Sequence, residues 1–353
     1  MKALVLSGGK GTRLRPITHT SAKQLVPIAN KPILFYGLEA IAKARIVKVG
    51  IVVGDTHSEI KASVGNGSAW GLKVTYIPQE APLGLAHAVK ISQNFIGRDN
   101  FVMFLGDNLL RDGIESFVKD FEEKRPNAQI LLAPVSHPEQ FGVAELSHGK
   151  VKRLEEKPKK PKSNLALVGV YMFDSHIFEA VSKIKPSRRN ELEITDAIQY
   201  LIDKKYTVTP HVVTGWWKDT GKLEDLLEAN RLVLESIKPR NGGTVDSKSK
   251  IEGNVIIEKN AKILGSRIRG PVMIGEHSVI KNSYVGPYTS VYHHTTLENC
   301  EVEHSIVLEN SRIENVRRIE SSLIGQNATV IKSSSQPSAY RIMIGDSSRV
   351  EVP

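Results

Sequence analysis

The sequence has little cysteine and no long hydrophobic run. Cys300 is the single cysteine among 353 residues, so an intrachain disulfide is impossible. This fits a reducing compartment, and we expect a cytoplasmic protein. No stretch approaches the roughly 18 uninterrupted apolar residues of a membrane-spanning helix, which predicts no membrane span. The first residues, MKALVLSGGK, lack the longer apolar core and the small-residue cleavage site of a signal peptide.

The sequence also lacks the aromatic-basic signature of RNA-binding domains, although its formal net charge is +10. Its lysines and arginines are spread along the chain instead of being clustered. We therefore expect no nucleic-acid partner. A pocket that holds several phosphate groups would favour the same positive charge.

Two parts of the chain differ in periodicity. In residues 1 to about 235, short apolar runs alternate with amphipathic segments of helical length. The runs are Lys2–Ser7, Lys48–Val53, Val74–Pro78 and Phe101–Leu105, and the helical segments include Ile33–Ala44 and Gly84–Phe95. This alternation predicts right-handed crossovers and a mostly parallel sheet, which binds ligands beyond the carboxyl ends of its strands.

The pattern changes after Lys238–Gly243, where proline and glycine end a helical segment. We therefore predict a first domain at residues 1–237, a linker at 238–245 and a second domain at 246–353. In the second domain, aliphatic residues recur every five or six positions, with a 17-residue register. The three expected columns are Ile251, Ile268, Val285, Val302 and Ile319; Ile257, Ile274, Val291 and Leu308; and Ile263, Ile280 and Leu297. A hexapeptide period with inward aliphatic residues predicts a parallel β-helix of 17-residue coils.

A glycine-rich loop, SGGKGTRLRP at residues 7–16, follows the first predicted strand directly. Its glycines let the backbone approach a phosphate closely and turn N–H groups toward it. Lys10, Arg13 and Arg15 add positive charge. The loop has neither the Gly-Lys-Ser/Thr ending of a Walker loop nor the glycine spacing of a dinucleotide-binding fingerprint.

With its continuation, the segment reads GGKGTRLRPIT…KQLVPIANKP. It resembles the signature of the sugar-phosphate nucleotidyltransferases, most closely the long-form glucose-1-phosphate thymidylyltransferases with a C-terminal hexapeptide-repeat domain. The resemblance covers nearly the whole chain. It implies a Rossmann-like domain, a left-handed parallel β-helix and a homo-oligomer. It also implies transfer of a nucleoside monophosphate from a nucleoside triphosphate to a sugar 1-phosphate, with release of pyrophosphate. The KQL segment favours dTTP, and hence dTDP-glucose as product.

The resemblance implies roles for single residues in several motifs. The nucleotide contacts are expected from Gly8, Gly9, Gly11, Thr12, Arg13, Gln24, Gln79, Gly84 and Asp107. The sugar-phosphate contacts are expected from Gly142, Glu156, Lys157 and Glu193, in the segments FGV, EEKP and ELEITD. Mg2+ is expected on Asp107, in LGDN, and on Asp219, in WWKDTG, because this ion prefers hard oxygen ligands and needs few carboxylates. Arg13, Lys23, Asp107 and Lys157 are the expected catalytic residues.

Each of these residue types suits its expected task. An amide such as Gln24 or Gln79 offers both a donor and an acceptor to a pyrimidine edge. Lys157 would hold the sugar phosphate as a compact point charge. The sugar phosphate oxygen is already a nucleophile at neutral pH, so in-line attack on the α-phosphorus needs positioning and charge stabilisation but no covalent intermediate.

Other functions are compatible with the same sequence. The substrates could instead be UTP with glucose 1-phosphate, or GTP with mannose 1-phosphate. Hexapeptide domains often carry coenzyme A-dependent acyltransferases with a histidine base, and four histidines are available: His277, His293, His294 and His304. A catalytically inactive regulatory subunit is the third alternative, against which Asp107 and Asp219 argue. We expect the β-helix to serve assembly and stability, with the chemistry confined to the first 235 residues.

Overall fold

The computed structural model describes residues 1–9, 11–19 and 21–333. The described residues form two compact units. The sheet unit comprises residues 1–9, 21–25 and 33–219, and the β-helix unit comprises residues 11–19, 26–32 and 220–333. Lys10 of the glycine-rich loop and the predicted β-helix beyond residue 333 lie outside the described residues.

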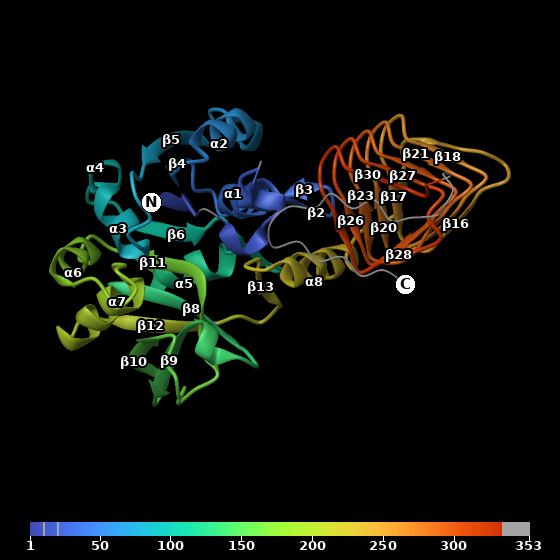
Figure 1. Ribbon diagram of the computed structural model, residues 1–353. Coiled ribbons are helices and arrows are strands. Elements are labelled where there is room, and N and C mark those ends of the chain that lie inside the picture. The colour runs from blue at the N-terminus through green and yellow to red at the C-terminus, as the bar shows by residue number, and fades with distance from the viewer. Residues whose placement is uncertain (10, 20, 334–353) are drawn as a thin grey trace. The chain divides into compact units, whose positions relative to one another are not determined.

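The sheet unit is built on a nine-stranded mixed sheet (Figure 1). Its parallel part has the order β5-β4-β1-β6, with bounds Lys73–Pro78, Lys48–Val53, Lys2–Ser7 and Phe101–Leu105. These are the four runs predicted from the sequence, and the predicted parallel sheet is confirmed here. The structure adds an antiparallel part around β11 (Leu165–Phe173), which pairs with β6, β8 (Ala128–Pro134) and β9 (Gly142–Ser147). Two outer strands complete the sheet, β10 (Lys150–Glu156) beside β9 and β12 (Val208–Val212) parallel to β8.

Helices cover both faces of this sheet because alternate strand residues point to opposite sides. In β1, Leu4 and Leu6 belong to one buried cluster, whereas Ala3 and Val5 belong to the other. The helices are α1 (Ile33–Lys43), α2 (His57–Val64), α3 (Leu85–Ile91), α4 (Gln93–Ile96), α5 (Glu115–Lys124), α6 (Ile177–Lys183) and α7 (Ile194–Asp203). Short 3-10 helices span Lys23–Leu25, Ser68–Trp70 and Pro138–Gln140, and a two-stranded ladder joins β7 (Asn108–Leu110) to β13 (Trp217–Asp219).

The helix expected over Gly84–Phe95 is broken into α3 and α4. The break lies at Ser92, which is fully buried and has φ −86° and ψ 0°. Its hydroxyl donates to Ala88 O at 2.7 Å, a side-chain bond that competes with the helical ladder. Gly84 stands outside the helix with φ +101°. In the part of the chain that the structure describes, no helix is long and apolar enough to cross a membrane.

The β-helix unit contains three sheets of parallel strands, which form the three faces of a prism (Figure 1). Within each sheet, the strands of successive coils lie side by side. The first holds β14 (Arg240–Asn241), β17 (Val255–Ile257), β20 (Val272–Ile274), β23 (Thr289–Val291), β26 (Ile306–Val307) and β29 (Leu323–Ile324). The second holds β15 (Thr244–Val245), β18 (Lys262–Leu264), β21 (Val279–Lys281), β24 (Thr296–Glu298), β27 (Arg312–Glu314) and β30 (Thr329–Ile331). The third holds β16 (Lys250–Glu252), β19 (Arg267–Arg269), β22 (Tyr284–Val285), β25 (Glu301–Glu303) and β28 (Ile319–Glu320). The predicted parallel β-helix is thus confirmed, and β14 and β15 already lie in the segment predicted as a linker.

The strand register confirms two of the three predicted aliphatic columns and corrects the third. The columns that start at Ile251 and Ile263 pair as expected, but Ile251 itself, in the first coil, is 38% exposed and not inside the β-helix. In the remaining column, however, Val291 pairs with Val307 and not with Leu308. The physical reason is a shorter turn: Val307 follows Val302 by five positions, whereas Val291 follows Val285 by six. Leu308 is buried beside the column that it was expected to join.

The β-helix unit also includes a helix, α8 (Leu223–Leu234), and N-terminal segments of the chain. These segments are the 3-10 turns Thr12–Leu14 and Ile17–His19 and the hairpin β2–β3 (Pro27–Ile28, Lys31–Pro32). Asn230 of α8, only 1% exposed, joins the hairpin to the β-helix. Its Oδ1 accepts hydrogen bonds from Ala29 N and Ser290 Oγ, both at 2.9 Å, and its Nδ2 donates to Tyr288 O at 3.0 Å.

We predict that Asn230→Leu destabilises the β-helix unit by about 2–4 kcal/mol, because three buried polar groups lose their partner while volume is roughly conserved. The measurement is urea denaturation followed by circular dichroism. Asn94→Leu, the same change at an exposed helical position, is the control and should shift the transition little. Equal unfolding midpoints for the two variants would show that the Asn230 contacts contribute nothing to stability.

Candidate active site

The glycine-rich loop leaves the sheet at the carboxyl end of β1, directly after Ser7. A Cβ atom on Gly8 would lie 3.1 Å from Gln79 Oε1, and one on Gly54 would lie 2.9 Å from Gly8 O. The ends of β1, β4 and β5 are therefore packed so closely that larger side chains would have to push their neighbours away. A Cβ on Gly9 would contact the Gln24 amide at 3.8 Å. The predicted nucleotide residues Gly8, Gly9, Gln24 and Gln79 thus lie together.

Lys23 and Asp107 form an ion pair beside this loop. The Lys23 ammonium donates to Asp107 Oδ2, and the two side chains are 8% and 21% exposed. Asp107 Oδ1 accepts from Asn108 Nδ2 at 2.8 Å. Burial raises the pKa of Asp107, but the charge of Lys23 and the hydrogen bonds outweigh it and hold the pKa below its usual value. Asp107 is therefore a carboxylate at neutral pH.

The second acidic motif is brought to the same edge by the β7–β13 ladder. Asp219 pairs with Asn108, the residue that follows Asp107. Asn108 is nearly buried, and its Oδ1 accepts from Trp217 Nε1 at 2.6 Å and from Gly169 N at 3.3 Å. The two expected metal ligands are therefore Asp219, on β13, and the residue that directly precedes its partner on β7. The described residues contain no group of three or more histidine, cysteine, aspartate or glutamate side chains that could hold a metal.

The two glutamines expected to read the base differ in their surroundings. Gln24 is 3% exposed, and its Oε1 is buried with no hydrogen-bond partner among the described residues. The Gln79 amide is instead hydrogen-bonded within the chain, because its Nε2 lies 3.0 Å from His87 Nδ1 and 3.4 Å from Gly84 O. Burial lowers the pKa of His87 and the charge of Lys90 adds to this, so the ring tends to be neutral. An orphaned buried acceptor such as Gln24 Oε1 is what a ligand donor would satisfy.

The segments expected to bind the nucleotide and the sugar phosphate meet at Gly84. Ala86 N donates to Leu192 O at 3.0 Å, and Leu192 N donates to Leu83 O at 2.8 Å. A Cβ on Gly84 would lie 2.4 Å from Leu192 O, so only glycine fits between these segments. The segment QEAPLG is thereby fixed against ELEITD.

In the part of the site expected to bind the sugar phosphate, two carboxylates surround one arginine. Glu193, 4% exposed, precedes α7 and accepts from Ser187 Oγ at 2.6 Å and from Arg189 Nη2 at 2.7 Å. Glu156 accepts from Arg189 Nη2 at 3.2 Å and from Thr195 Oγ1 at 3.3 Å. Burial raises the pKa of Glu156 and the charge of Glu193 raises it further, while Arg189 partly offsets both. This corner therefore holds two acidic acceptors that share one guanidinium.

Gly142 and Lys157 frame this corner. A Cβ on Gly142 would lie 2.7 Å from Thr195 Cγ2 and 3.1 Å from Glu156 Oε2. Lys157 N donates to Phe141 O at 3.0 Å, and its φ of 44° places it in the left-handed region. The structure thus brings Gly142, Glu156, Lys157 and Glu193 to one corner of the sheet unit.

Three predicted nucleotide residues belong to the β-helix unit. Gly11 has φ 63°, and Thr12 and Arg13 are exposed in the 3-10 turn that follows it. Sequence reasoning also missed several contacts in the sheet unit, namely those of Ser187, Arg189, Thr195, Asn108 and His87. Only the RRNELEITD run, in which a basic residue precedes Glu193 by four positions, gave a usable signal for one of them, Arg189.

We predict that Arg189→Gln destabilises the protein by about 2 kcal/mol at pH 8 and by less at pH 5. Without the guanidinium, the pKa of Glu156 rises further above the unfolded value. The ionised pair then opposes folding at high pH, and protonation relieves the repulsion as the pH falls through the raised pKa. Urea denaturation at both pH values measures the difference, with exposed Arg188→Gln as the control. An equal loss at pH 8 and pH 5 would contradict the prediction.

Comparison with known proteins agrees with this geometry. Residues 2–236 match the Nucleotidyl transferase family. The chain is 57% identical over 353 residues to a glucose-1-phosphate thymidylyltransferase of Streptomyces griseus, covering 100% of this chain and 99% of that protein. It is 55% identical over 354 residues to the Streptomyces antibioticus enzyme of the same name, with the same coverage. The crystal structure of a Bacillus anthracis protein described as a glucose-1-phosphate thymidylyltransferase matches with TM-score 0.64 and 36% identity. That match covers 68% of this chain and 98% of the other. The chain therefore belongs to the nucleotidyl transferase family of enzymes, whose members act on nucleoside triphosphates and sugar phosphates.

Proposed function

We propose that this enzyme joins dTTP and glucose 1-phosphate to form dTDP-glucose and pyrophosphate. The observation that carries the proposal is the full-length likeness to two enzymes of that name, at 57% and 55% identity. The geometry supports it, because the sheet unit holds a glycine-lined edge with an unpartnered buried amide oxygen next to a carboxylate–ammonium pair. A corner with two sugar-type acceptors lies in the same unit.

Repulsion between two polyanionic substrates is the main obstacle to this reaction. Loop N–H groups at Gly8 and Gly9, with the Arg13 guanidinium, would hold the triphosphate. Lys157 would hold the attacking sugar phosphate. Lys23 would leave Asp107 and neutralise charge at the α-phosphate or on the departing pyrophosphate. The sugar phosphate oxygen would then attack the α-phosphorus in line, with no proton to remove.

The residues present fit Mg2+. Asp107 and Asp219 offer two hard carboxylate donors at one edge, and the substrates would supply phosphate oxygens for the rest of the shell. When bound, the ion would neutralise charge that develops on the phosphates. In its absence, Lys23 balances the Asp107 charge.

Base and sugar would be recognised at opposite ends of the QEAPLG–ELEITD junction. Gln24 Oε1 would accept the N3–H of thymine, a donor that cytosine lacks, while its amide group would donate to a base oxygen. Gln79 would border the base from the other side of Gly8. Glu156 and Glu193 would accept hydrogen bonds from sugar hydroxyls, since both already serve as acceptors for hydroxyl groups of the chain.

We also propose that the enzyme acts in the cytoplasm and as a homo-oligomer. The proposed domains are the catalytic domain at 1–237, the linker at 238–245 and the β-helix from 246 to 353. The use of a single cysteine supports a reducing location, because no disulfide can form within this sequence.

We predict that the wild-type enzyme releases pyrophosphate fastest with dTTP and glucose 1-phosphate, in a panel of triphosphates against sugar 1-phosphates. Gln24→Ala should lower the ratio of dTTP to dCTP efficiency by about tenfold, because one buried hydrogen bond to the base is lost and its partner is left unpaired. Gln93→Ala, at an exposed position, is the control. Preference for another triphosphate would overturn the proposed substrate. An unchanged ratio of dTTP to dCTP efficiency in Gln24→Ala would show that other residues recognise the base.

We predict that Asp107→Asn keeps the fold and lowers turnover by about two orders of magnitude or more, because the metal loses a carboxylate and Lys23 loses its counter-ion. Asp112→Asn, an exposed carboxylate paired with Arg111, is the control. Isothermal titration with Mg2+ supplies a second readout and should show no binding to Asp107→Asn. Near-normal turnover in this variant after chelation of divalent metals would rule out the assignment.

A further inference from the structure

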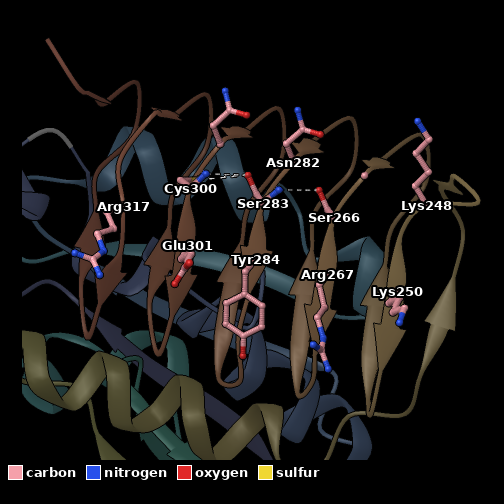
Figure 2. Close-up of a pocket in the computed structure, with 12 residues that line it drawn as sticks. Lys248, Lys250, Ser266, Arg267, Asn282, Ser283, Tyr284, Cys300, Glu301 and Arg317 are labelled. Carbon is pink, nitrogen blue, oxygen red and sulfur yellow. Dashed lines mark hydrogen bonds between the residues drawn. The ribbon is translucent and has the colours of Figure 1, made fainter. Parts of the chain in front are cut away.

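One face of the β-helix carries an open groove of about 610 Å³. Figure 2 shows Ser266, Ser283 and Cys300 on successive coils of this groove. Ser283 N donates to Ser266 Oγ at 3.1 Å, and Cys300 N donates to Ser283 Oγ at 3.2 Å. Both hydroxyls also donate to backbone oxygens, at 2.8 Å and 2.7 Å. These hydroxyls therefore serve the stacking of the coils and are not left for a ligand.

In the sheet unit, by contrast, the start of α3 holds the side-chain amide of Gln79 in one orientation. Its Nε2 lies 3.4 Å from Gly84 O and 3.0 Å from His87 Nδ1. A backbone carbonyl oxygen can only accept a hydrogen bond, so the amide atom beside Gly84 must be the nitrogen. The same nitrogen then donates its second hydrogen to His87 Nδ1. Gly84 and His87 are three positions apart, which places both acceptors on one face of the helix.

His87 Nδ1 can accept this hydrogen bond only if the ring is neutral and carries its proton on Nε2. Burial lowers the pKa of His87, and the charge of Lys90 lowers it further. The elements that pack against α3 are β1, α4, α6 and α7. Among the described residues, however, Lys90 of the same helix is the one whose charge acts on the ring. The ring is therefore mostly neutral at neutral pH.

The orientation of the Gln79 amide decides what it presents to the glycine-rich loop. Its Oε1 lies beside Gly8, because a Cβ on Gly8 would be 3.1 Å from this oxygen. In the described part of the chain, no group donates a hydrogen bond to Gln79 Oε1. The loop therefore meets an acceptor and not an NH2 group.

We propose that His87 is a positioning residue for recognition of the nucleobase, because it keeps the oxygen of Gln79 turned toward the base. This inference rests on the proposed binding of dTTP beside Gln24 and Gln79. The N3–H of thymine would meet the Gln79 oxygen in addition to that of Gln24. Cytosine has a lone pair at N3, so an acceptor held at this place rejects it.

Protonation of His87 weakens this preference. The ring then carries a hydrogen on Nδ1, and two donors face each other across 3.0 Å. Half a turn of the amide relieves this conflict, because a charge-assisted bond from His87 to Gln79 Oε1 outweighs the longer contact with Gly84 O. The NH2 group of Gln79 then faces the base, where it suits the N3 lone pair of cytosine and opposes the N3–H of thymine.

The experiment measures kcat/KM for dTTP and for dCTP, each with glucose 1-phosphate, between pH 5 and pH 8.5. The readout is the ratio of the two values, since loss of folded enzyme and titration of the sugar-binding carboxylates affect both triphosphates alike. In the wild type the ratio should fall by about tenfold as the pH falls through the pKa of His87, below the ordinary histidine value of about 6.5. Its midpoint should coincide with the pKa of His87 measured by NMR.

Two variants separate acceptance of the hydrogen bond from titration. His87→Asn places Oδ1 where Nδ1 stands, one bond beyond Cγ, so it accepts from Gln79 but does not titrate. Its ratio at pH 8 should stay within about threefold of the wild type and should lack the tenfold fall. His87→Leu has a similar size and no acceptor. It should lower the ratio by about fivefold at pH 8, through a higher KM for dTTP with little change in kcat.

The matched control is His148→Asn, at an exposed turn between β9 and β10 where φ is 49°. This variant should keep the pH profile of the wild type, and any protonation of cytosine itself is common to all four proteins. A wild type with no preference for dTTP at pH 8 overturns the proposed substrate and this role with it.

Other results overturn the role of His87 alone and leave the proposed substrate in place. One is an unchanged ratio in His87→Leu when the wild type prefers dTTP. Another is a single pH profile shared by the wild type and His87→Asn. A loss of kcat that is equal for both triphosphates in His87→Leu would show a purely structural role and would also overturn the proposal.

Discussion

The ion pair between Lys23 and Asp107 is the interaction on which the candidate active site depends. Both side chains are largely withdrawn from water, so neither charge could remain there alone without a large desolvation penalty. Asn108 completes the arrangement, because it donates to Asp107 while accepting from Trp217 and thereby links β6, β7 and β13. In the absence of substrates the charges of Lys23 and Asp107 balance each other. In the proposed reaction, the Lys23 ammonium would bind substrate phosphates and the Asp107 carboxylate would bind the metal.

The β-helix contacts a segment that lies close in the chain to two of the expected site residues. The hairpin at 26–32 follows Lys23 and Gln24 directly in the chain, and it is held to the β-helix by Asn230 and by Asn30, which donates to Val291 O at 2.8 Å. A truncation near Lys238 would remove Tyr288, Ser290 and Val291, the partners of these two asparagines. The expectation that chemistry is confined to the first 235 residues stays a prediction, but the hairpin and α8 within them are held by residues beyond 245.

Much of this architecture could be predicted from local sequence, and the exceptions have physical causes. Apolar runs ending in glycine or aspartate predict β1, β4 and β6, and the 17-residue register predicts most of the stacking. The antiparallel part around β11 could not be predicted, because eight of its nine residues are buried and a continuous apolar run gives no strand direction. Leu308 was misassigned because one shorter turn moves its neighbour Val307 into the column.

In the candidate site too, some residues could be predicted from the sequence and others could not. Residues in compact motifs could be named from the resemblance, and the structure gathers those of the sheet unit. The spacing of Arg189 from Glu193 gave a usable signal, but its contact with Glu156 could not be predicted, because Glu156 is distant in the chain and reaches Arg189 only through the packing of β10 against α7. Asn230 gave no signal either, since a single asparagine in an amphipathic helix normally faces water.

The central claim is that Lys23 stands in for a metal at Asp107 until substrates arrive. The most direct measurement is isothermal titration of the substrate-free enzyme with Mg2+ at pH 8, comparing wild type with Lys23→Met. The account predicts that the variant binds Mg2+ about tenfold more tightly, because Asp107 has lost its competing cation, while turnover falls. Equal or weaker Mg2+ binding in the variant would contradict the account.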